Sequence, residues 1–380
     1  MIFRILEDQL AQKAREKDID RRFMELALTL GRRGLGRTWP NPAVGAVVVK
    51  DGVIVGRGWT QAGGRPHAEP VALAQAGEAA RGATVYVTLE PCSHFGKSPP
   101  CADAVIAAGI ARVVSALEDP NPEVAGAGHA RLRAAGITVD VGLGAEEARR
   151  DHAGHIRRMR DGRPHVMLKI AASADGKAGA AGRKPVAITG ERTRERVHLL
   201  RARSDAIMIG IGTALADDPI LTCRLPGMTE DSPVRVVLDS KLRLSTNSRL
   251  VRSAREVPLW VVTAPGAPSA AKEAVEAAGV TVLSVARADG RLDLGATLRL
   301  LGERGISRLM VEAGPILAAA LLEADLVDEV ALFRSDKVVG PDGIDALEGI
   351  PLTALSQSPH LASVQSEAVG EDSCEIFERR

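Results

Sequence analysis

The chain has 380 residues, more than one hydrophobic core usually organises, so we expect two domains. Lys and Arg number 49 against 48 Asp and Glu, and the aromatic residues are only three Trp, one Tyr and five Phe. A net charge of +1 with so few aromatic rings disfavours binding to nucleic acid or to an acidic membrane surface.

The four cysteines, Cys92, Cys101, Cys223 and Cys374, contain no C-x-x-C pair and do not resemble a secreted disulfide framework. The first 20 residues are charged and lack the apolar core of a signal peptide, and no apolar run approaches the length of a membrane span. We therefore expect a soluble cytoplasmic enzyme.

In chain order, residues 1–19 mix charges with scattered apolar residues, which predicts a frayed helix or a disordered extension. A helix is expected from Asp20, as its N-cap, to Gly31, because apolar residues recur there at helical spacing. A loop then leads into a buried strand at 44–49, and Asp51-Gly52 predicts a hairpin turn into a strand at 53–58.

The next stretch alternates turns and short elements. Gly63-Gly64-Arg65-Pro66 is typical of a turn, and a helix is predicted at 68–76, with Pro70 tolerable in its first turn. A strand at 84–90 ends just before Cys92, and a helix at 102–108 begins just after Cys101.

One imidazole and two thiols in this stretch predict a metal site. His67, Cys92 and Cys101 can supply three ligands to a tetrahedral Zn²⁺, which leaves the fourth position for water, as in a catalytic site. Glu69 lies about 200° around an ideal helix from His67, so the metal must sit over the helix end. Glu69 would then carry the proton. The purely structural alternative is a buried histidine, a glutamate in a first helical turn and two unrelated cysteines.

Further strands at 111–117 and 137–141, with a helix at 124–135 between them, predict an α/β layer with a largely parallel sheet. Ligands to such a sheet gather at the carboxyl ends of its strands, where the predicted metal residues lie. A charged helix at 145–160 ends at Asp161-Gly162-Arg163-Pro164, where we place the domain boundary.

The second half repeats the alternation of strands and helices. Helices are expected at 193–203 and 270–278, and Pro315 opens a third helix just after Gly314. Glycines at the ends of strands, at Gly210, Gly212 and Gly314, expose backbone N–H groups that favour a phosphate. The predicted strands are 165–171, 206–210, 234–239, 259–263, 281–285, 309–312 and 330–333.

The combination H-x-E followed by P-C-x-x-C is the signature of zinc nucleobase deaminases. The segment from Pro91 to Cys101, P-C-S-H-F-G-K-S-P-P-C, has eight residues between its cysteines instead of two, and it closely resembles the bifunctional riboflavin biosynthesis deaminase and reductase family. Pro40-Asn41-Pro42 is similar to the deaminase half of that family, and 169–177 and 311–315 are similar to its reductase half. The resemblance covers about residues 20–375.

The resemblance implies an α/β fold, with a cytidine-deaminase-like α/β/α domain at 20–164 and a dihydrofolate-reductase-like α/β domain at 165–380, after an N-terminal extension at 1–19. It implies one Zn²⁺ per chain in the first domain and NADPH in the second. The implied reactions are hydrolytic deamination of 2,5-diamino-6-(5-phosphoribosylamino)pyrimidin-4(3H)-one and then reduction of its ribosyl side chain to ribityl phosphate. We expect a homo-oligomer whose partner is this small pyrimidine nucleotide, with no nucleic acid and no membrane.

The family pattern also implies roles for individual residues, with zinc on His67, Cys92 and Cys101 and Glu69 as the catalytic carboxylate. The segment Pro185-Val186-Ala187 departs from the pattern, because it lacks an aromatic ring that the family usually has there. The implied substrate-binding residues are Asn41, His94, Lys97, Arg201, Ile220, Arg224 and Glu312. The implied cofactor-binding residues are Ala171, Thr213, Asp217, Ser240, Gly314, Pro315, Ile316 and Leu317.

Two other functions remain compatible with these patterns. One is a nucleic-acid base deaminase with an accessory domain, which the near-zero net charge disfavours. The other is a zinc-stabilised binding module whose second half senses a dinucleotide without turnover. Replacement of Glu69 by Gln separates the module from the enzyme, because only the enzyme should lose ammonia release.

Overall fold

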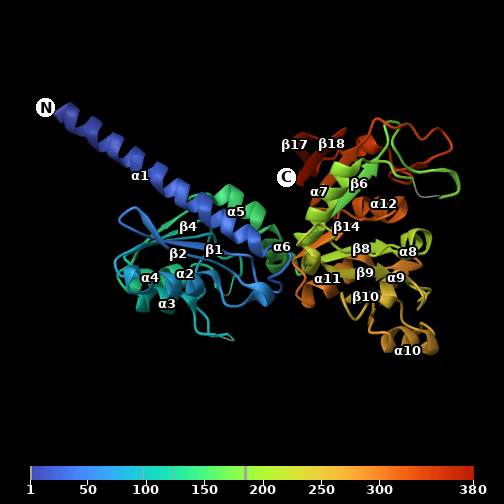
Figure 1. Ribbon diagram of the computed structural model, residues 1–380, viewed down its shortest axis with the longest axis horizontal. Coiled ribbons are helices and arrows are strands. Elements are labelled where there is room, and N and C mark those ends of the chain that lie inside the picture. Colours follow the sequence, from blue (N-terminus) through green and yellow to red (C-terminus); the bar gives the residue numbers. More distant parts are fainter. Residues whose placement is uncertain (1, 97, 123, 184–185) are drawn as a thin grey trace. The chain divides into compact units, whose positions relative to one another are not determined.

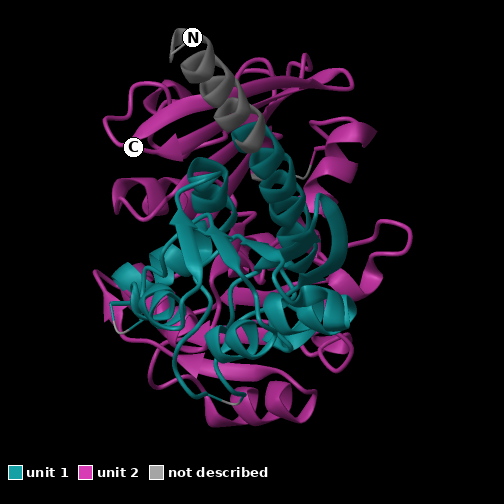
Figure 2. Ribbon diagram, turned by 90° about the vertical axis from the view of Figure 1, so that its left-hand side faces the viewer, with its two compact units in different colours: residues 1–161 teal, residues 162–380 magenta. Residues whose placement is uncertain are grey.

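The computed structural model describes residues 2–96, 98–122, 124–183 and 186–380, with side chains from residue 17 onward, Arg183 excepted. The chain forms two compact units, residues 1–161 and 162–380 (Figures 1 and 2). Each unit has its own sheet and its own buried core. Among the described residues, no helix combines the length and the apolar character that a membrane crossing requires.

The first unit contains a five-stranded sheet in the order β2-β1-β3-β4-β5. Its β1 pairs antiparallel with both β2 and β3, whereas β3, β4 and β5 are parallel. The prediction of a largely parallel sheet is therefore wrong for the half that contains β1 and β2. A tight turn joins these two strands, and such a turn can only join antiparallel strands. The strands are β1 (Gly45–Lys50), β2 (Val53–Trp59), β3 (Thr84–Val87), β4 (Arg112–Ser115) and β5 (Thr138–Val141).

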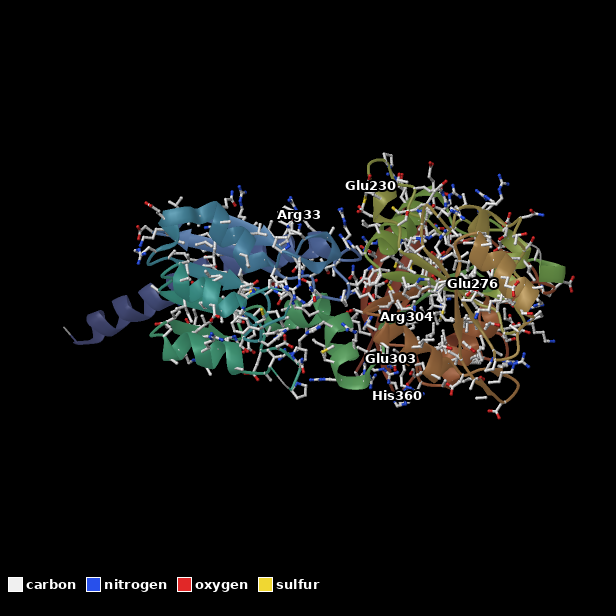
Figure 3. All side chains as sticks on the ribbon, turned by 90° about the horizontal axis from the view of Figure 1, so that it is seen from below. Arg33, Glu230, Glu276, Glu303, Arg304 and His360 are labelled. Carbon is white, nitrogen blue, oxygen red and sulfur yellow. The ribbon has the colours of Figure 1, made fainter. Side chains whose placement is uncertain are left out.

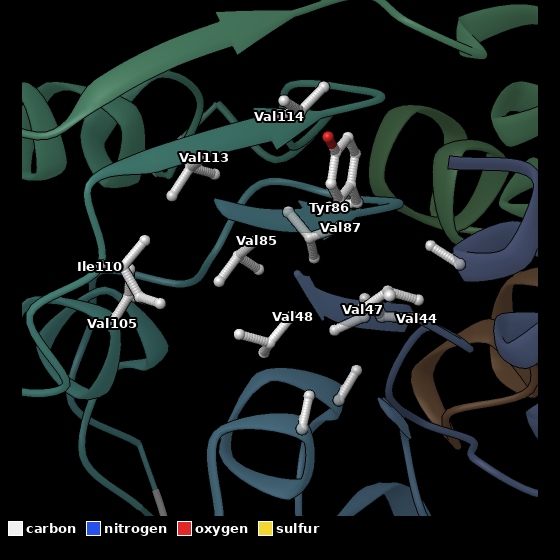
Figure 4. Packing of buried hydrophobic residues seen from close by; sticks show 14 of the residues in the cluster. Val44, Val47, Val48, Val85, Tyr86, Val87, Val105, Ile110, Val113 and Val114 are labelled. Atoms are coloured by element: carbon white, nitrogen blue, oxygen red, sulfur yellow. The ribbon is translucent and has the colours of Figure 1, made fainter. Parts of the chain in front are cut away.

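Helices cover both faces of this sheet. Helices α1 and α5 contact one another, α1 packs on β1 and β3, and α2 packs on β1, β2 and α3. The core between these layers is built largely from valines of the central strands, such as Val47, Val48 and Val85 (Figure 4). The helices are α1 (Ile2–Gly31), α2 (Ala68–Ala76), α3 (Cys101–Ala107), α4 (Ala127–Ala134), α5 (Ala145–Asp151) and α6 (Ala153–Asp161).

Two further sequence expectations fail in this unit. Asp20 does not cap a helix, because α1 is continuous from Ile2 through the segment expected to be frayed or disordered. Its carboxylate instead accepts hydrogen bonds from the Tyr86 hydroxyl at 2.5 Å and from the Arg112 guanidinium at 2.8 and 3.0 Å, which fixes α1 to the sheet. The single helix expected at 145–160 is divided in two at His152.

The second unit contains a nine-stranded sheet in the order β11-β10-β9-β8-β14-β6-β15-β18-β17. In this sheet order, neighbouring strands from β11 to β15 are parallel. At the other edge β18 pairs antiparallel with β15, and β17 pairs antiparallel with β18. The strands are β6 (His165–Ala172), β8 (Ala206–Gly210), β9 (Val234–Leu238), β10 (Leu259–Thr263), β11 (Thr281–Ser284), β14 (Arg308–Val311), β15 (Glu329–Arg334), β17 (Leu361–Val369) and β18 (Asp372–Arg379).

Two small antiparallel pairs lie in sequence between strands of the large sheet. They are β7 (Lys177–Gly179) with β16 (Ile344–Asp345), and β12 (Arg287–Ala288) with β13 (Arg291–Leu292). Exposed charges of both signs are interspersed on the second unit, as Glu303 and Arg304 illustrate (Figure 3). The helices are α7 (Glu191–Ala202), α8 (Ile211–Asp217), α9 (Arg249–Arg252), α10 (Ser269–Ala277), α11 (Leu294–Glu303) and α12 (Pro315–Glu323).

A buried ion pair joins the beginning of the second unit to its far strands. The Arg163 guanidinium donates to the Asp328 carboxylate at 2.6 and 3.0 Å, and that carboxylate also accepts from the backbone N–H of Val166 at 2.9 Å. Burial by itself raises the pKa of Asp328, but its hydrogen bonds and the Arg163 charge outweigh burial and hold the pKa below its ordinary value.

Candidate functional site

In the first unit, His67, Cys92 and Cys101 come together from three different elements. His67 is the extended residue just before α2, Cys92 lies on the loop after β3, and Cys101 is the first residue of α3. The His67 Nδ1 atom lies 3.3 Å from the Cys101 sulfur and 3.8 Å from the Cys92 sulfur. Ligands held at 2.0 to 2.3 Å by a tetrahedral ion are roughly 3.3 to 3.8 Å apart, so this set fits zinc.

Local backbone contacts bring these ligands together. Gly64 has a φ of +84°, and its carbonyl accepts a hydrogen bond from the Asn41 side-chain amide at 2.7 Å, so the turn before His67 is fixed. The backbone N–H of Cys101 donates to the Cys92 sulfur at 3.3 Å, and the N–H of Ala102 donates to the Cys92 carbonyl at 3.1 Å. Hydrogen bonds from Cys101 and His67 lower the pKa of the Cys92 thiol, which favours the thiolate that zinc requires.

Glu69 lies in the first turn of α2 and is only 3% exposed. Burial raises the pKa of its carboxyl to about 7, although the nearby His67 partly opposes the rise. A carboxyl group with a pKa near neutrality can both accept and return a proton. The donor set and the adjacent buried carboxyl group therefore fit a hydrolytic zinc site.

The three residues expected to bind the pyrimidine nucleotide differ in their surroundings. Asn41 is half-buried, and its amide is engaged with Gly64, so part of its hydrogen-bonding capacity is already used within the protein. His94 is exposed on the loop between the two cysteines. Lys97 lies outside the described residues. In the same loop Ser98 accepts a hydrogen bond from Arg65, a cation beside the metal ligands that the sequence did not single out.

A second group of potential metal ligands is formed by Glu90, Glu118 and His129. The Glu90 carboxylate, however, already accepts hydrogen bonds from the backbone N–H groups of Asp119, Gly126 and His129, each at 3.0 Å. This pattern anchors the 118–129 segment to the strand end that precedes Cys92, and it explains the buried carboxylate without a metal.

The second unit contains a cavity of about 910 Å³ at the carboxyl ends of β6, β8, β9 and β14. Arg201 and Glu312 meet in it through paired hydrogen bonds of 2.5 and 2.9 Å. Burial by itself raises the pKa of Glu312, but Arg201 outweighs it and holds the pKa below its ordinary value. The predicted residues that line the cavity are Ala171, Arg201, Thr213, Asp217, Ser240, Glu312, Gly314, Pro315, Ile316 and Leu317.

Ile220 and Arg224, also expected to bind substrate, are not among the residues that line this cavity, whereas Pro219 and Leu221 are. The side chain of Arg224 is exposed, and its backbone N–H donates to His198. Leu221 has a φ of +60°, so the backbone turns at this point and the side chains that face the cavity differ from those the motif suggested.

Sequence reasoning missed Lys169, which lines the cavity from β6. Burial lowers its pKa, and the charge of Glu312 partly opposes that effect. A lysine inside the apolar run Val166 to Ala172 is the signal that could have identified it, because a cation in a core strand needs a partner. Polar groups converging on a large concave site fit a dinucleotide together with a small substrate.

The two halves of the chain match two described families. Residues 17–117 match the cytidine and deoxycytidylate deaminase zinc-binding region, and residues 164–374 match the RibD C-terminal domain. The class of protein is thus a bifunctional enzyme, a zinc-binding deaminase joined to a reductase.

Relatives with known names extend over nearly the whole chain. The riboflavin biosynthesis protein RibD of Escherichia coli (strain K12) is 44% identical over 93% of this chain and 98% of its own length, and that of Aquifex aeolicus is 40% identical over 96% and 99%. The solved structure of Acinetobacter baumannii RibD superposes with a TM-score of 0.85 at 34% identity, covering 96% of this chain and 99% of that one. The chain belongs to the RibD family of riboflavin biosynthesis proteins.

A further similar solved structure is of a protein named for both activities. It is a Thermotoga maritima diaminohydroxyphosphoribosylaminopyrimidine deaminase/5-amino-6-(5-phosphoribosylamino)uracil reductase, with a TM-score of 0.83, 36% identity, and coverage of 96% of this chain and 100% of that one. The fold class expected from the sequence, a deaminase-like domain followed by a reductase-like α/β domain, is confirmed.

Proposed function

We propose that the first unit deaminates 2,5-diamino-6-(5-phosphoribosylamino)pyrimidin-4(3H)-one and that the second unit reduces the ribosyl side chain of the product to ribityl phosphate. The observation that carries the first step is the buried Glu69 beside the cluster of His67, Cys92 and Cys101. The family relationship supports both steps, since named relatives cover nearly the whole chain.

In the deaminase, His67, Cys92 and Cys101 would hold one zinc ion per chain. When bound, zinc would lower the pKa of a water molecule to a value near neutrality. Glu69 accepts a proton from the water that attacks the ring carbon bearing the amino group, and then returns a proton to the departing amine, which leaves as ammonia. Asn41, His94 and Lys97 are the proposed contacts to the pyrimidine nucleotide.

In the reductase, NADPH would supply a hydride to C1 of the ribosyl group, the bond between C1 and the ring oxygen would break, and that oxygen would take up a proton to become a ribityl hydroxyl. The backbone N–H groups of Gly314, Ile316 and Leu317 at the beginning of α12 and the Thr213 side chain would bind its phosphates. Arg201 would bind the substrate through its guanidinium, and Glu312 would hold that guanidinium in place through their paired hydrogen bonds. Ile220 and Arg224 remain proposed substrate contacts from the loop beside the cavity.

We assign the deaminase to residues 20–164, the reductase to 165–380 and an extension to 1–19, with a homo-oligomeric assembly in the cytoplasm. Four free cysteines support a reducing compartment. Val186 and Ala187 line the cavity where the family usually has an aromatic ring, and Pro185 lies outside the described residues. We expect weaker packing against the cofactor at that position, with the reaction retained.

The experiment supplies the purified chain with the diaminopyrimidine nucleotide and NADPH, and follows ammonia and the absorbance of the reduced nicotinamide together. We expect one ammonia released and one NADPH oxidised per substrate, with oxidation following deamination. Ammonia without NADPH oxidation would refute the reductase assignment, and NADPH oxidation without ammonia would refute the deaminase assignment.

A further inference from the structure

One side of helix α6 carries two histidines and an arginine, each in contact with a different loop of the first unit. His152 lies just before α6, and its carbonyl accepts a hydrogen bond from the Ile156 N–H at 2.9 Å, so helical spacing begins at His152. His152, His155 and Arg158 follow one another at intervals of three residues and therefore lie along one side of the helix.

The first contact joins α6 to the strand that leads to Cys92. The His152 Nε2 atom lies 3.1 Å from the Thr88 hydroxyl oxygen, which also accepts a hydrogen bond from the Gly45 N–H at 3.1 Å. Because β1 is antiparallel to β3, Gly45 at the beginning of β1 adjoins the end of β3. His152 thus holds the two strand ends from which the Cys92 loop and the Asn41 loop extend.

The second contact joins α6 to the loop that follows β4. The His155 Nε2 atom lies 3.3 Å from the Asp119 Oδ1 atom, which also accepts a hydrogen bond from the Asn121 N–H at 2.9 Å. The Asp119 N–H donates to the Glu90 carboxylate at 3.0 Å. The side chains of His155 and Asp119 are only 10% and 14% exposed, so water competes little for this contact.

The third contact reaches the loop that precedes β1. The Arg158 guanidinium donates to the Pro40 carbonyl at 2.8 Å, and this carbonyl belongs to the same planar peptide unit as the Asn41 N–H. The Asn41 side-chain amide donates to the Gly64 carbonyl at 2.7 Å. Within the described part of the chain, no N–H or O–H group donates to the Asn41 Oδ1 atom, so this oxygen can accept a hydrogen bond from an amino group of a pyrimidine.

We propose that Arg158 is a positioning residue of the deaminase. It holds the peptide unit between Pro40 and Asn41, so that the Asn41 side chain meets the pyrimidine nucleotide, and His152 and His155 anchor the same helix to the neighbouring loops. This inference rests on the proposed deaminase function and on the proposed contact of Asn41 with the substrate.

The contacts of the metal ligands differ from those of Arg158. Cys92 and Cys101 are joined by the Cys101 N–H, which donates to the Cys92 sulfur at 3.3 Å, and the Ala102 N–H donates to the Cys92 carbonyl. Loss of the Arg158 side chain leaves these hydrogen bonds in place. We therefore expect its loss to weaken the binding of the nucleotide while the metal is retained.

The test compares the full-length chain with the variants Arg158→Gln, Arg158→Lys and Asn41→Ala and with the double variant Arg158→Gln/Asn41→Ala. Arg160→Gln is the control, because Arg160 is an exposed arginine of the same helix. Ammonia release at increasing concentrations of the diaminopyrimidine nucleotide gives kcat and KM. Zinc per chain and the melting curve are measured on the same samples.

Loss of the charge-assisted hydrogen bond should raise KM about 10-fold in Arg158→Gln, with kcat within about threefold and zinc retained. Arg158→Lys should keep KM within about threefold of the unmodified chain, because an ammonium group still donates to the carbonyl. The double variant should have the KM of Asn41→Ala, because Arg158 acts through Asn41. Arg160→Gln should behave like the unmodified chain.

Several results would overturn the proposal. They are an unfolded or zinc-free Arg158→Gln protein, an unchanged KM in Arg158→Gln or in Asn41→Ala, additive effects in the double variant, and an equal rise of KM in Arg160→Gln. An unmodified chain that binds zinc but releases no ammonia would instead overturn the proposed deaminase.

Discussion

Replacement of Gly58 by Ala should damage the metal site from a distance. A Cβ atom at Gly58 would lie 2.2 Å from the Ala68 carbonyl oxygen and 2.7 Å from the Ala72 amide nitrogen, whereas ordinary contact begins at 3.4 Å. Helix α2 must therefore shift by about 1.2 Å away from β2, and it carries His67 and Glu69 with it. Metal ligands tolerate displacements of only about 0.2 Å, so zinc should be lost.

Overpacking of this kind costs about 1–3 kcal/mol, which a domain of this size can survive folded. In molecules that retain zinc, misplacement of Glu69 by about 1 Å should lower the deamination rate by about 100-fold. The assay measures zinc per chain by atomic absorption, ammonia release and the melting curve, with Val53→Ala as the control because Val53 lies on the same strand and is 63% exposed. A folded Gly58→Ala protein with full zinc content and normal ammonia release would refute this reasoning.

Three further predictions follow from separate contacts. Removal of the metal with a chelator should abolish ammonia release yet leave NADPH binding intact, because the cavity is lined only by residues of the second unit; fluorescence titration of the chelated protein checks this. Asp328→Ala should lower the free energy of unfolding of the second unit by about 3–5 kcal/mol and its Tm by about 6–20 °C, because Arg163 stays buried without its partner. The pKa of Asp328 is lowered by folding, so its stabilisation is complete above the unfolded value of about 3.9 and is lost as pH falls through the folded value. The difference in the free energy of unfolding between the unmodified chain and Asp328→Ala, measured by denaturant titration, should therefore be constant near neutral pH and become smaller in acid.

The parts of the fold that local pattern determines were predictable. Helix α2 has the predicted bounds, because a glycine and proline turn ends at His67 and an alanine-rich segment follows it. The Asp51-Gly52 turn joins β1 and β2 as expected, with positive φ at both residues. Local turn chemistry acts within a few residues, so sequence alone reveals it.

The parts that depend on distant contacts were not predictable. The sequence around Asp20 is typical of a helix cap, but the Asp20 carboxylate accepts hydrogen bonds from Tyr86 and Arg112, which belong to strands of the sheet. The hairpin of β17 and β18 alternates polar and small residues without a clear apolar face, because it is a partly exposed sheet edge.

The candidate sites show the same division between local and distant information. His67, Cys92 and Cys101 could be grouped because their types and spacing are distinctive. In contrast, single lysines and arginines occur throughout the chain, and only folding brings Lys169, Arg243 and Arg291 to the lining of one cavity. Their importance depends on neighbours that are far away in sequence.

The most direct test of the central claim is the Glu69→Gln substitution, followed by zinc analysis and an ammonia assay on the same protein. Glutamine has nearly the shape of glutamate but cannot accept the proton of the attacking water, and Glu69 is not one of the three proposed ligands. We predict about one zinc per chain, an unchanged affinity for NADPH and no detectable ammonia from the diaminopyrimidine nucleotide. Ammonia release at the rate of the unmodified chain would contradict the hydrolytic mechanism.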